Sequence, residues 1–121
     1  MTSQEQLSSF IQSIFRSIWQ LELLLALKRD PGFRSHDELV TALRASDLIV
    51  SQGLAALAAA GLIVTDEEER AAYGPVSKGD ARLVEEVEAL YARSPDAVRR
   101  LIVGSPSGLS AFADAFRLRR D

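Results

Sequence analysis

Two helix-start signals, 11 residues apart, constrain the fold of this chain more than any other feature. Ser35 is followed by Glu38 at the spacing of a capping box, in which each side chain accepts a hydrogen bond from the other residue's backbone amide. Ser46 begins a second helix, which ends at Gly61, a residue suited to the left-handed conformation after a helix terminus. The first helix is therefore short, ends near Arg44, and is joined to the second by a tight turn.

The segments on either side of this helix pair have different periods. Apolar residues recur every three or four positions over residues 4–29, which predicts one long helix or two abutting helices. Residues 33–35 have room only for a very short strand. Residues 62–65 and 71–73 are predicted strands, and the turn at 66–70 lacks the Asn-Gly or Asp-Gly pair of a two-residue hairpin. We therefore expect an antiparallel hairpin with a longer turn.

Further helices are predicted in the last third of the chain. Ser77 and Ser94 are N-cap residues, and Pro95 occupies the first helical position after Ser94. The helix after Ser94 is expected to stop at Gly104. Apolar residues at helical spacing over residues 109–116 then predict a last amphipathic helix.

A resemblance to a known motif lies in the segment Val50-Ser51-Gln52-Gly53-Leu54-Ala55-Ala56-Leu57-Ala58-Ala59-Ala60-Gly61-Leu62-Ile63. This segment resembles the second helix of the winged helix-turn-helix of many bacterial transcription regulators, running into the first wing strand. The resemblance covers about half of the chain. It implies a mainly α fold with a small β-hairpin wing: a winged helix-turn-helix core at residues 18–76, an N-terminal amphipathic helical extension at 1–17 and a C-terminal helical segment at 77–121.

The resemblance also implies a function, which is transcription regulation by DNA binding as a homodimer built from flanking helices. In this superfamily the second helix enters the major groove and the wing often touches a phosphate strand. The candidate nucleic-acid contacts are Arg44, Ser46, Ser51, Gln52 and Arg70.

Charge favours an alternative. The formal net charge of the chain is −3, and within residues 35–62 Arg44 is the single basic residue against three carboxylates. The turn at 66–70 carries one aspartate and three glutamates beside Arg70. Half to two-thirds of protein–DNA hydrogen bonds go to the phosphate-sugar backbone, which these carboxylates repel. The alternative is a protein–protein interaction module on a winged-helix scaffold that does not bind DNA through its acidic wing.

Apolar side chains expected on outward faces support this alternative. Leu48 and Ile49 cannot both point inward if Val50 does, and an exposed apolar residue beside small side chains invites a protein partner. The N-terminal extension carries more apolar surface than a three-helix motif covers, so either the C-terminal helices or a second chain must cover it. The candidate partner contacts are Leu48, Ile49, Ala55, Ala56, Leu7, Phe10 and Ile14.

Positive charge gathers in the last quarter of the chain, as a basic patch of Arg99, Arg100, Arg117, Arg119 and Arg120. These arginines either contact phosphate or an acidic protein, or form a solvated face that complements the dipole of a helix C-terminus.

Residue types that carry enzyme chemistry are scarce. The chain has no cysteine and one histidine, His36, and it contains neither a phosphate-binding glycine loop nor a serine in a nucleophile elbow. The glutamates at 85, 86 and 88 are expected on the outer, solvated face of a helix. We therefore expect no enzymatic activity, no metal and no cofactor.

The stretch at residues 18–27, taken as the most apolar of the chain, is ten residues long and contains Gln20 and Glu22, whereas a membrane-spanning helix needs about 20 apolar residues. The polar N-terminus lacks the pattern of a signal peptide. We therefore expect a soluble, cytoplasmic protein without a membrane partner.

Overall fold

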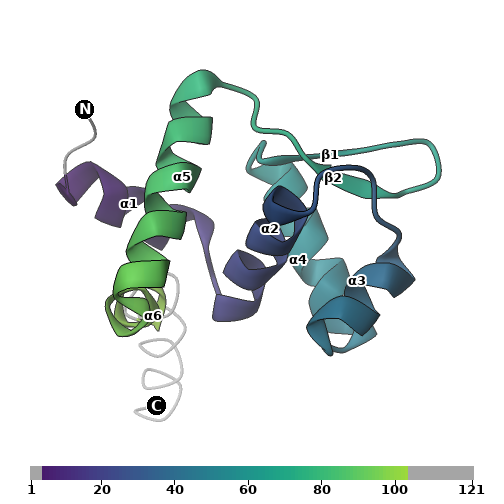
Figure 1. Cartoon of the computed structure of the whole chain (residues 1–121), viewed down its shortest axis with the longest axis horizontal. Coiled ribbons are helices and arrows are strands. Elements are labelled where there is room, and N and C mark those ends of the chain that lie inside the picture. Colours follow the sequence, from purple (N-terminus) through teal and green to yellow (C-terminus); the bar gives the residue numbers. More distant parts are fainter. Residues whose placement is uncertain (1–3, 104–121) are drawn as a thin grey trace, which may run out of the picture.

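The computed structural model describes residues 4–103, which form helices and one antiparallel hairpin (Figure 1). This confirms the expected mainly α fold with a small β-hairpin. The elements in chain order are α1 (Gln4–Ile14), α2 (Ile18–Arg29), α3 (His36–Leu43), α4 (Asp47–Ala59), β1 (Ile63–Thr65), β2 (Ala71–Tyr73), α5 (Lys78–Arg93) and α6 (Pro95–Val103). The last amphipathic helix expected at 109–116 lies outside the described residues.

The apolar run at the N-terminus forms two helices, because the chain bends by 104° between α1 and α2. Gln20, only 4% exposed, supplies hydrogen bonds at this bend. Its Nε2 donates to the carbonyl of Ile14 at 2.8 Å, and its Oε1 accepts from the amide of Arg16 at 3.1 Å. Backbone groups that lose their helical partners at the bend are therefore satisfied by one buried side chain.

The capping signals are confirmed at α3 and α4. Ser35 and Glu38 form the reciprocal capping box at the start of α3, and the Ser46 hydroxyl accepts from the amide of Ile49 at the start of α4. Arg44 ends α3 with a φ of 53°, and Gly61 follows α4 with a φ of 76°. Left-handed conformations at these two positions make the turns that set α3, α4 and the hairpin in place.

β1 pairs with β2 in the register Ile63↔Tyr73, and Arg34 extends this pairing on the other edge of β2. The amide of Arg34 donates to the carbonyl of Ala71 at 2.8 Å, and the amide of Ala71 donates back at 2.9 Å. The very short strand expected at 33–35 is thus a single bridge. It ties the segment between α2 and α3 to the hairpin.

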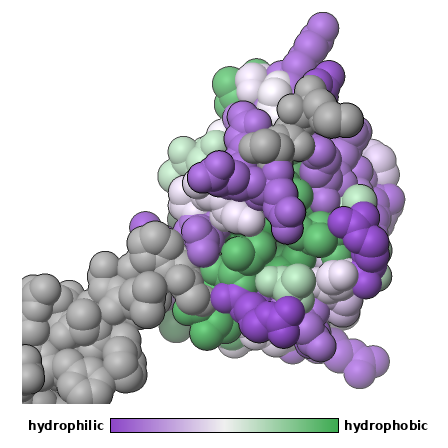
Figure 2. Space-filling model, turned by 90° about the vertical axis from the view of Figure 1, so that its left-hand side faces the viewer, coloured by the Kyte–Doolittle hydropathy of each residue, from purple (hydrophilic) through white to green (hydrophobic). Residues whose placement is uncertain are grey.

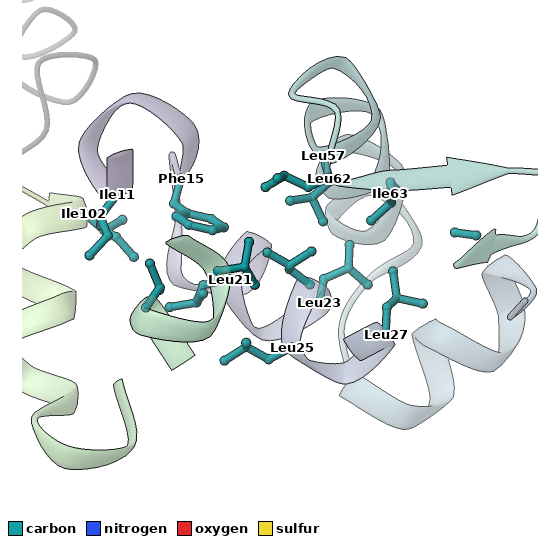
Figure 3. Close-up of a cluster of buried hydrophobic side chains, with 14 of the residues drawn as sticks. Ile11, Phe15, Leu21, Leu23, Leu25, Leu27, Leu57, Leu62, Ile63 and Ile102 are labelled. Carbon is teal, nitrogen blue, oxygen red and sulfur yellow. The ribbon is translucent and has the colours of Figure 1, made fainter. Parts of the chain in front are cut away.

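Helix α2 runs through the centre of the molecule (Figure 1). α4 packs on it. Its leucines lie between two groups of buried side chains, Ile11, Phe15 and Ile102 on one side and Leu57, Leu62 and Ile63 on the other (Figure 3). The five α2 leucines in this core are Leu21, Leu23, Leu24, Leu25 and Leu27.

The N-terminal helix α1 packs against α5 and α6. Ile11 and Phe15 are fully buried there, whereas Leu7, Phe10 and Ile14 are half-buried at the edge of the core. The sequence left open whether the C-terminal helices or a second chain cover the apolar N-terminus. In the structure, α5 and α6 of the same chain cover part of that apolar surface. Hydrophobic surface bordered by hydrophilic residues is still visible on this side of the molecule (Figure 2).

A partly buried ion-pair network joins α2 to α5 and corrects one expectation from the sequence. Glu85 is exposed as expected, but Glu88 is half-buried, with its carboxylate 2.7 Å from Lys28 Nζ and 3.3 Å from Arg29 Nε. Glu86 is also half-buried. α5 therefore lies against α2 along a face that the sequence pattern assigns to solvent.

Within residues 4–103, no single helix is long and apolar enough to cross a membrane. α1 and α2 meet the length and composition required only when taken together across their bend.

Candidate functional site

Two grooves flank helix α4. The α2–α4 groove, of about 990 Å³, lies between α4 and the junction of α1 with α2, and its main apolar lining residues are Ile14, Trp19, Ile49, Ala55, Ala56 and Ala59. The α4–hairpin groove, of about 540 Å³, lies between α4 and the β1–β2 turn, and its lining includes His36, Asp47, Ser51, Ala58, Thr65 and Glu69.

The α2–α4 groove has more apolar than polar lining residues, and its polar ones are Ser13, Arg16, Ser17, Gln20 and Gln52. Arg16 is the one charged residue among those that line it. Trp19 stands at its wall with 39% of its surface exposed, a large fraction for so big an apolar side chain. The opposite wall is made of small α4 side chains, because alanines occupy three of the positions that face it. A partner backbone can approach such a wall closely.

Two features of the fold set the shape of this groove: the hydrogen bonds of Gln20 at the bend and the close approach of α4 to α2. Gln20 holds the bend that places the end of α1 beside the start of α2. Gly53 lets α4 approach α2, since a Cβ at this position would lie only 2.8 Å from Leu23 Cδ2. The two helices are therefore in close contact at Gly53, which also forms the floor of the groove.

The structure brings together four of the candidate partner residues: Ile14, Ile49, Ala55 and Ala56 all line the α2–α4 groove. Leu48 is 64% exposed on α4 but is not part of this lining. Leu7 and Phe10 lie further back on α1, half-buried against the core and outside the groove.

Trp19 is the largest of the groove residues that sequence reasoning missed. Helical periodicity assigns Ile18, Leu21 and Leu25 to the inner face, and Trp19 falls outside that face. The signal that identifies it is an aromatic residue at a position where the period predicts a polar one, because a solvated helix face seldom carries a tryptophan.

The candidate nucleic-acid contacts do not converge on one surface. Ser51 lines the α4–hairpin groove, whereas Gln52 lines the α2–α4 groove on the other side of α4. The Ser46 hydroxyl is engaged as the N-cap of α4. Arg44 is exposed in the turn before α4 and has no ion pair within residues 4–103.

Arg70 is paired with two carboxylates of its own turn. Its Nε lies 2.7 Å from Asp66 Oδ2 and 3.4 Å from Glu68 Oε2, and the hydrogen bond to Asp66 raises the pKa of Arg70. Desolvation opposes ionisation of Asp66, but hydrogen bonds from Arg70 and from the Glu68 amide outweigh it, so the pKa of Asp66 is lowered. Arg70 is therefore charged but already paired.

The surface formed by α3, the start of α4 and the hairpin turn is acidic. His36 Nε2 lies 2.6 Å from Asp47 Oδ1, which links the first residues of the two helices. Asp37, Glu67 and Glu69 are exposed on the same segments and have no ion pair within the described residues. The acidic balance seen in the sequence is thus displayed on α3, the start of α4 and the hairpin turn.

Two residues of the basic patch fall in the described residues. Arg99 and Arg100 are both exposed on α6, and Arg99 Nη1 lies 3.6 Å from Asp96 Oδ1. Arg117, Arg119 and Arg120 lie outside the described residues, so the patch as a whole is not described.

The helices and hairpin are compatible with a winged helix, with α2, α3 and α4 as its helical core. In the described part of the chain, no group of three or more histidine, aspartate or glutamate side chains is placed to hold a metal ion. No protein-family model matches the sequence, and comparisons with curated proteins and with solved structures give no match.

Proposed function

We propose that this protein is a protein–protein interaction module on a winged-helix scaffold, and that the α2–α4 groove binds an amphipathic helical segment of a partner protein. The observation that carries the proposal is the exposed Trp19 facing a wall of alanines across an almost uncharged groove. An amphipathic helix laid in a hydrophobic groove is a recurrent mode of peptide recognition.

The dimensions of the groove suit such a segment. Its α4 wall runs from Ile49 to Ala59, which is about 15 Å of helix, or nearly three turns. Tryptophan is among the residues most enriched at the hot spots of protein interfaces. The α4–hairpin groove is a weaker candidate for the same partner, because Asp47 and Glu69 line it and would have to be desolvated.

A pair of adjacent α4 residues gives a matched test. Ala59 and Ala58 are both exposed, but Ala59 lines the α2–α4 groove and Ala58 lines the α4–hairpin groove. With the full chain as bait in nuclease-treated extract, Ala59→Arg should abolish capture of the partner, whereas Ala58→Arg should retain it. Equal capture by both variants contradicts the proposal.

Salt dependence adds a second criterion. Apolar docking is little screened by salt, whereas contacts between exposed charges weaken as the Debye length falls. Capture through the α2–α4 groove should therefore persist from 0.15 M to 0.5 M salt, on the order of a threefold increase in ionic strength. A partner that is released over this range binds elsewhere.

A second candidate function is transcription regulation by DNA binding as a homodimer. It is favoured by the order of α2, α3, α4 and the hairpin, and by the exposed Arg44 in the turn before α4. Affinity for duplex DNA would then fall steeply with salt, and Arg44→Glu would weaken it. Fluorescence anisotropy with labelled duplex measures both, and binding undiminished by Arg44→Glu removes the helix-turn-helix from the interface.

A further inference from the structure

We infer that the α2–α4 groove binds an acidic amphipathic helix, one of whose carboxylates pairs with Arg16. This inference rests on the proposed function, because it takes the groove as a site for a helical segment of a partner protein. It adds the charge of that segment, and it states which of the two grooves beside α4 the segment enters.

The charge on the walls of the α2–α4 groove is positive. Arg16 is the one charged residue among those that line it, so neither aspartate nor glutamate contributes to the lining. Arg16 is exposed and has no ion pair within residues 4–103. An arginine guanidinium presents its donors in a planar fork that matches the two oxygens of a carboxylate. A carboxylate of the partner can therefore pair with Arg16 without displacing one from residues 4–103.

Arg16 lies just before α2, where the first turn of this helix opens into the groove. Ser17, the N-cap of α2, and Trp19 both line the groove. The first turn of α2 contains no acidic residue, so no carboxylate there offsets the positive end of the helix dipole. The dipole therefore adds to the charge of Arg16, and both favour a negative group on the partner at this end of the groove.

The α4–hairpin groove, on the other side of α4, has the opposite charge. Asp47 and Glu69 line it, whereas lysine and arginine are absent from its lining. Glu69 is exposed and has no ion pair within the described residues. Alanines of α4 line both grooves, so small side chains alone do not distinguish them. Charge does, because an acidic helix is repelled by the carboxylates near the hairpin and attracted to Arg16.

The partner segment is therefore defined by two properties. Its apolar face covers Trp19 and the alanines of α4, over the roughly ten helical residues that match the length of this wall. A glutamate or aspartate borders that face, at the end of the segment that meets Arg16.

A displayed library of helical peptides tests this charge with the full chain as bait. Each peptide has about 14 residues, or four turns, with leucine, isoleucine or phenylalanine on one face and glutamate, lysine or glutamine beside it. We expect selection to enrich glutamate over lysine about fivefold near one end of the peptide, the affinity ratio that one exposed ion pair gives. Non-specific attraction to a chain of net charge −3 would enrich lysine instead.

Substitutions of Arg16 identify the source of the preference. Arg16→Gln should remove it, and Arg16→Glu should reverse it in favour of lysine. Arg44→Glu is the matched control, because Arg44 is exposed in the turn before α4 and does not line the groove. This control changes the net charge as Arg16→Glu does, and should leave the preference for glutamate intact. Enrichment of lysine or of neither charge by the unaltered chain overturns the inference, as does a preference for glutamate that survives Arg16→Glu.

The substitution Ala59→Arg separates this inference from the function on which it rests. If the selected peptides lose binding to Ala59→Arg but glutamate is not enriched among them, the inference fails and the proposed function stands. If no selected peptide depends on Ala59, the proposed function fails, and the inference fails with it. Peptides that are rich in glutamate, lose binding to Ala59→Arg and retain it with Ala58→Arg support both.

Discussion

Gly53 of α4 lies against Leu23 of α2 so closely that a Cβ at residue 53 would approach Leu23 Cδ2 to 2.8 Å. Leu23 is buried in the core, where its side chain has little room to move. The crossing of α2 and α4, and with it the floor of the α2–α4 groove, is therefore set by the absence of one methyl group.

Gly53→Ala tests this contact. Alanine gains up to about 1 kcal/mol of helix propensity over glycine, but overpacking a core costs about 1–3 kcal/mol, so we expect a net loss of about 1 kcal/mol. Urea denaturation measures the free energy of unfolding. Gly79→Ala is the matched control, since a Cβ there meets only Ser77 Oγ at 3.8 Å, and it should be neutral or stabilising. Stabilisation by both substitutions would contradict close packing at Gly53.

Gln20→Leu tests the bend between α1 and α2. Leucine has a similar size but cannot accept from the Arg16 amide or donate to the Ile14 carbonyl. Leaving these groups without a partner should lower the free energy of unfolding by about 2 kcal/mol. Trp19 emission should shift as the adjacent wall of the groove moves. Gln12→Leu, on α1, is the control and should change neither quantity.

Glu88→Gln tests the ion pairs between α2 and α5 through their pH dependence. The hydrogen bond from Lys28, helped by Arg29 and opposed by desolvation, lowers the pKa of Glu88 below 4.5. The ionised carboxylate therefore stabilises the fold fully above about pH 4.5, and this contribution is lost as the pH falls through the lower pKa of the folded state.

We expect Glu88→Gln to lower the free energy of unfolding by about 1 kcal/mol at pH 7, with the difference from wild type shrinking toward pH 3. Denaturant titrations across this range measure it. Glu85→Gln, at an exposed position of the same helix, should follow the wild-type pH profile. A pH-independent difference for Glu88→Gln would mean that charge is not its source.

The parts of this fold that the sequence predicts are those set by neighbouring residues. The caps at Ser35 and Ser46 and the terminator Gly61 each act within a few positions, so spacing alone identifies them. The contact of Glu88 with Lys28 joins residues 60 positions apart, and no local pattern marks it. The α2–α4 groove also depends on residues far apart in the sequence. It requires the bend between α1 and α2, and the apolar periodicity does not distinguish one long helix from two.

The hairpin turn provides the last prediction, on the electrostatic barrier to DNA. Glu67 and Glu68 are exposed there, and Glu68 also pairs with Arg70. Glu67→Lys combined with Glu68→Lys reverses two charges and leaves Arg70 with Asp66 alone. If this turn faces phosphate when a duplex approaches α4, the slope of log K against log salt should steepen by about 2.

Anisotropy titrations with a random-sequence duplex at several salt concentrations measure this slope. Glu5→Lys combined with Glu85→Lys changes the net charge equally at exposed positions on α1 and α5, away from the turn. A steeper slope for the turn variant alone locates the acidic barrier at the hairpin, since the net charges of the two variants are identical. Equal slopes would show that the turn does not approach phosphate, and that overall charge alone governs the affinity of this chain for nucleic acid.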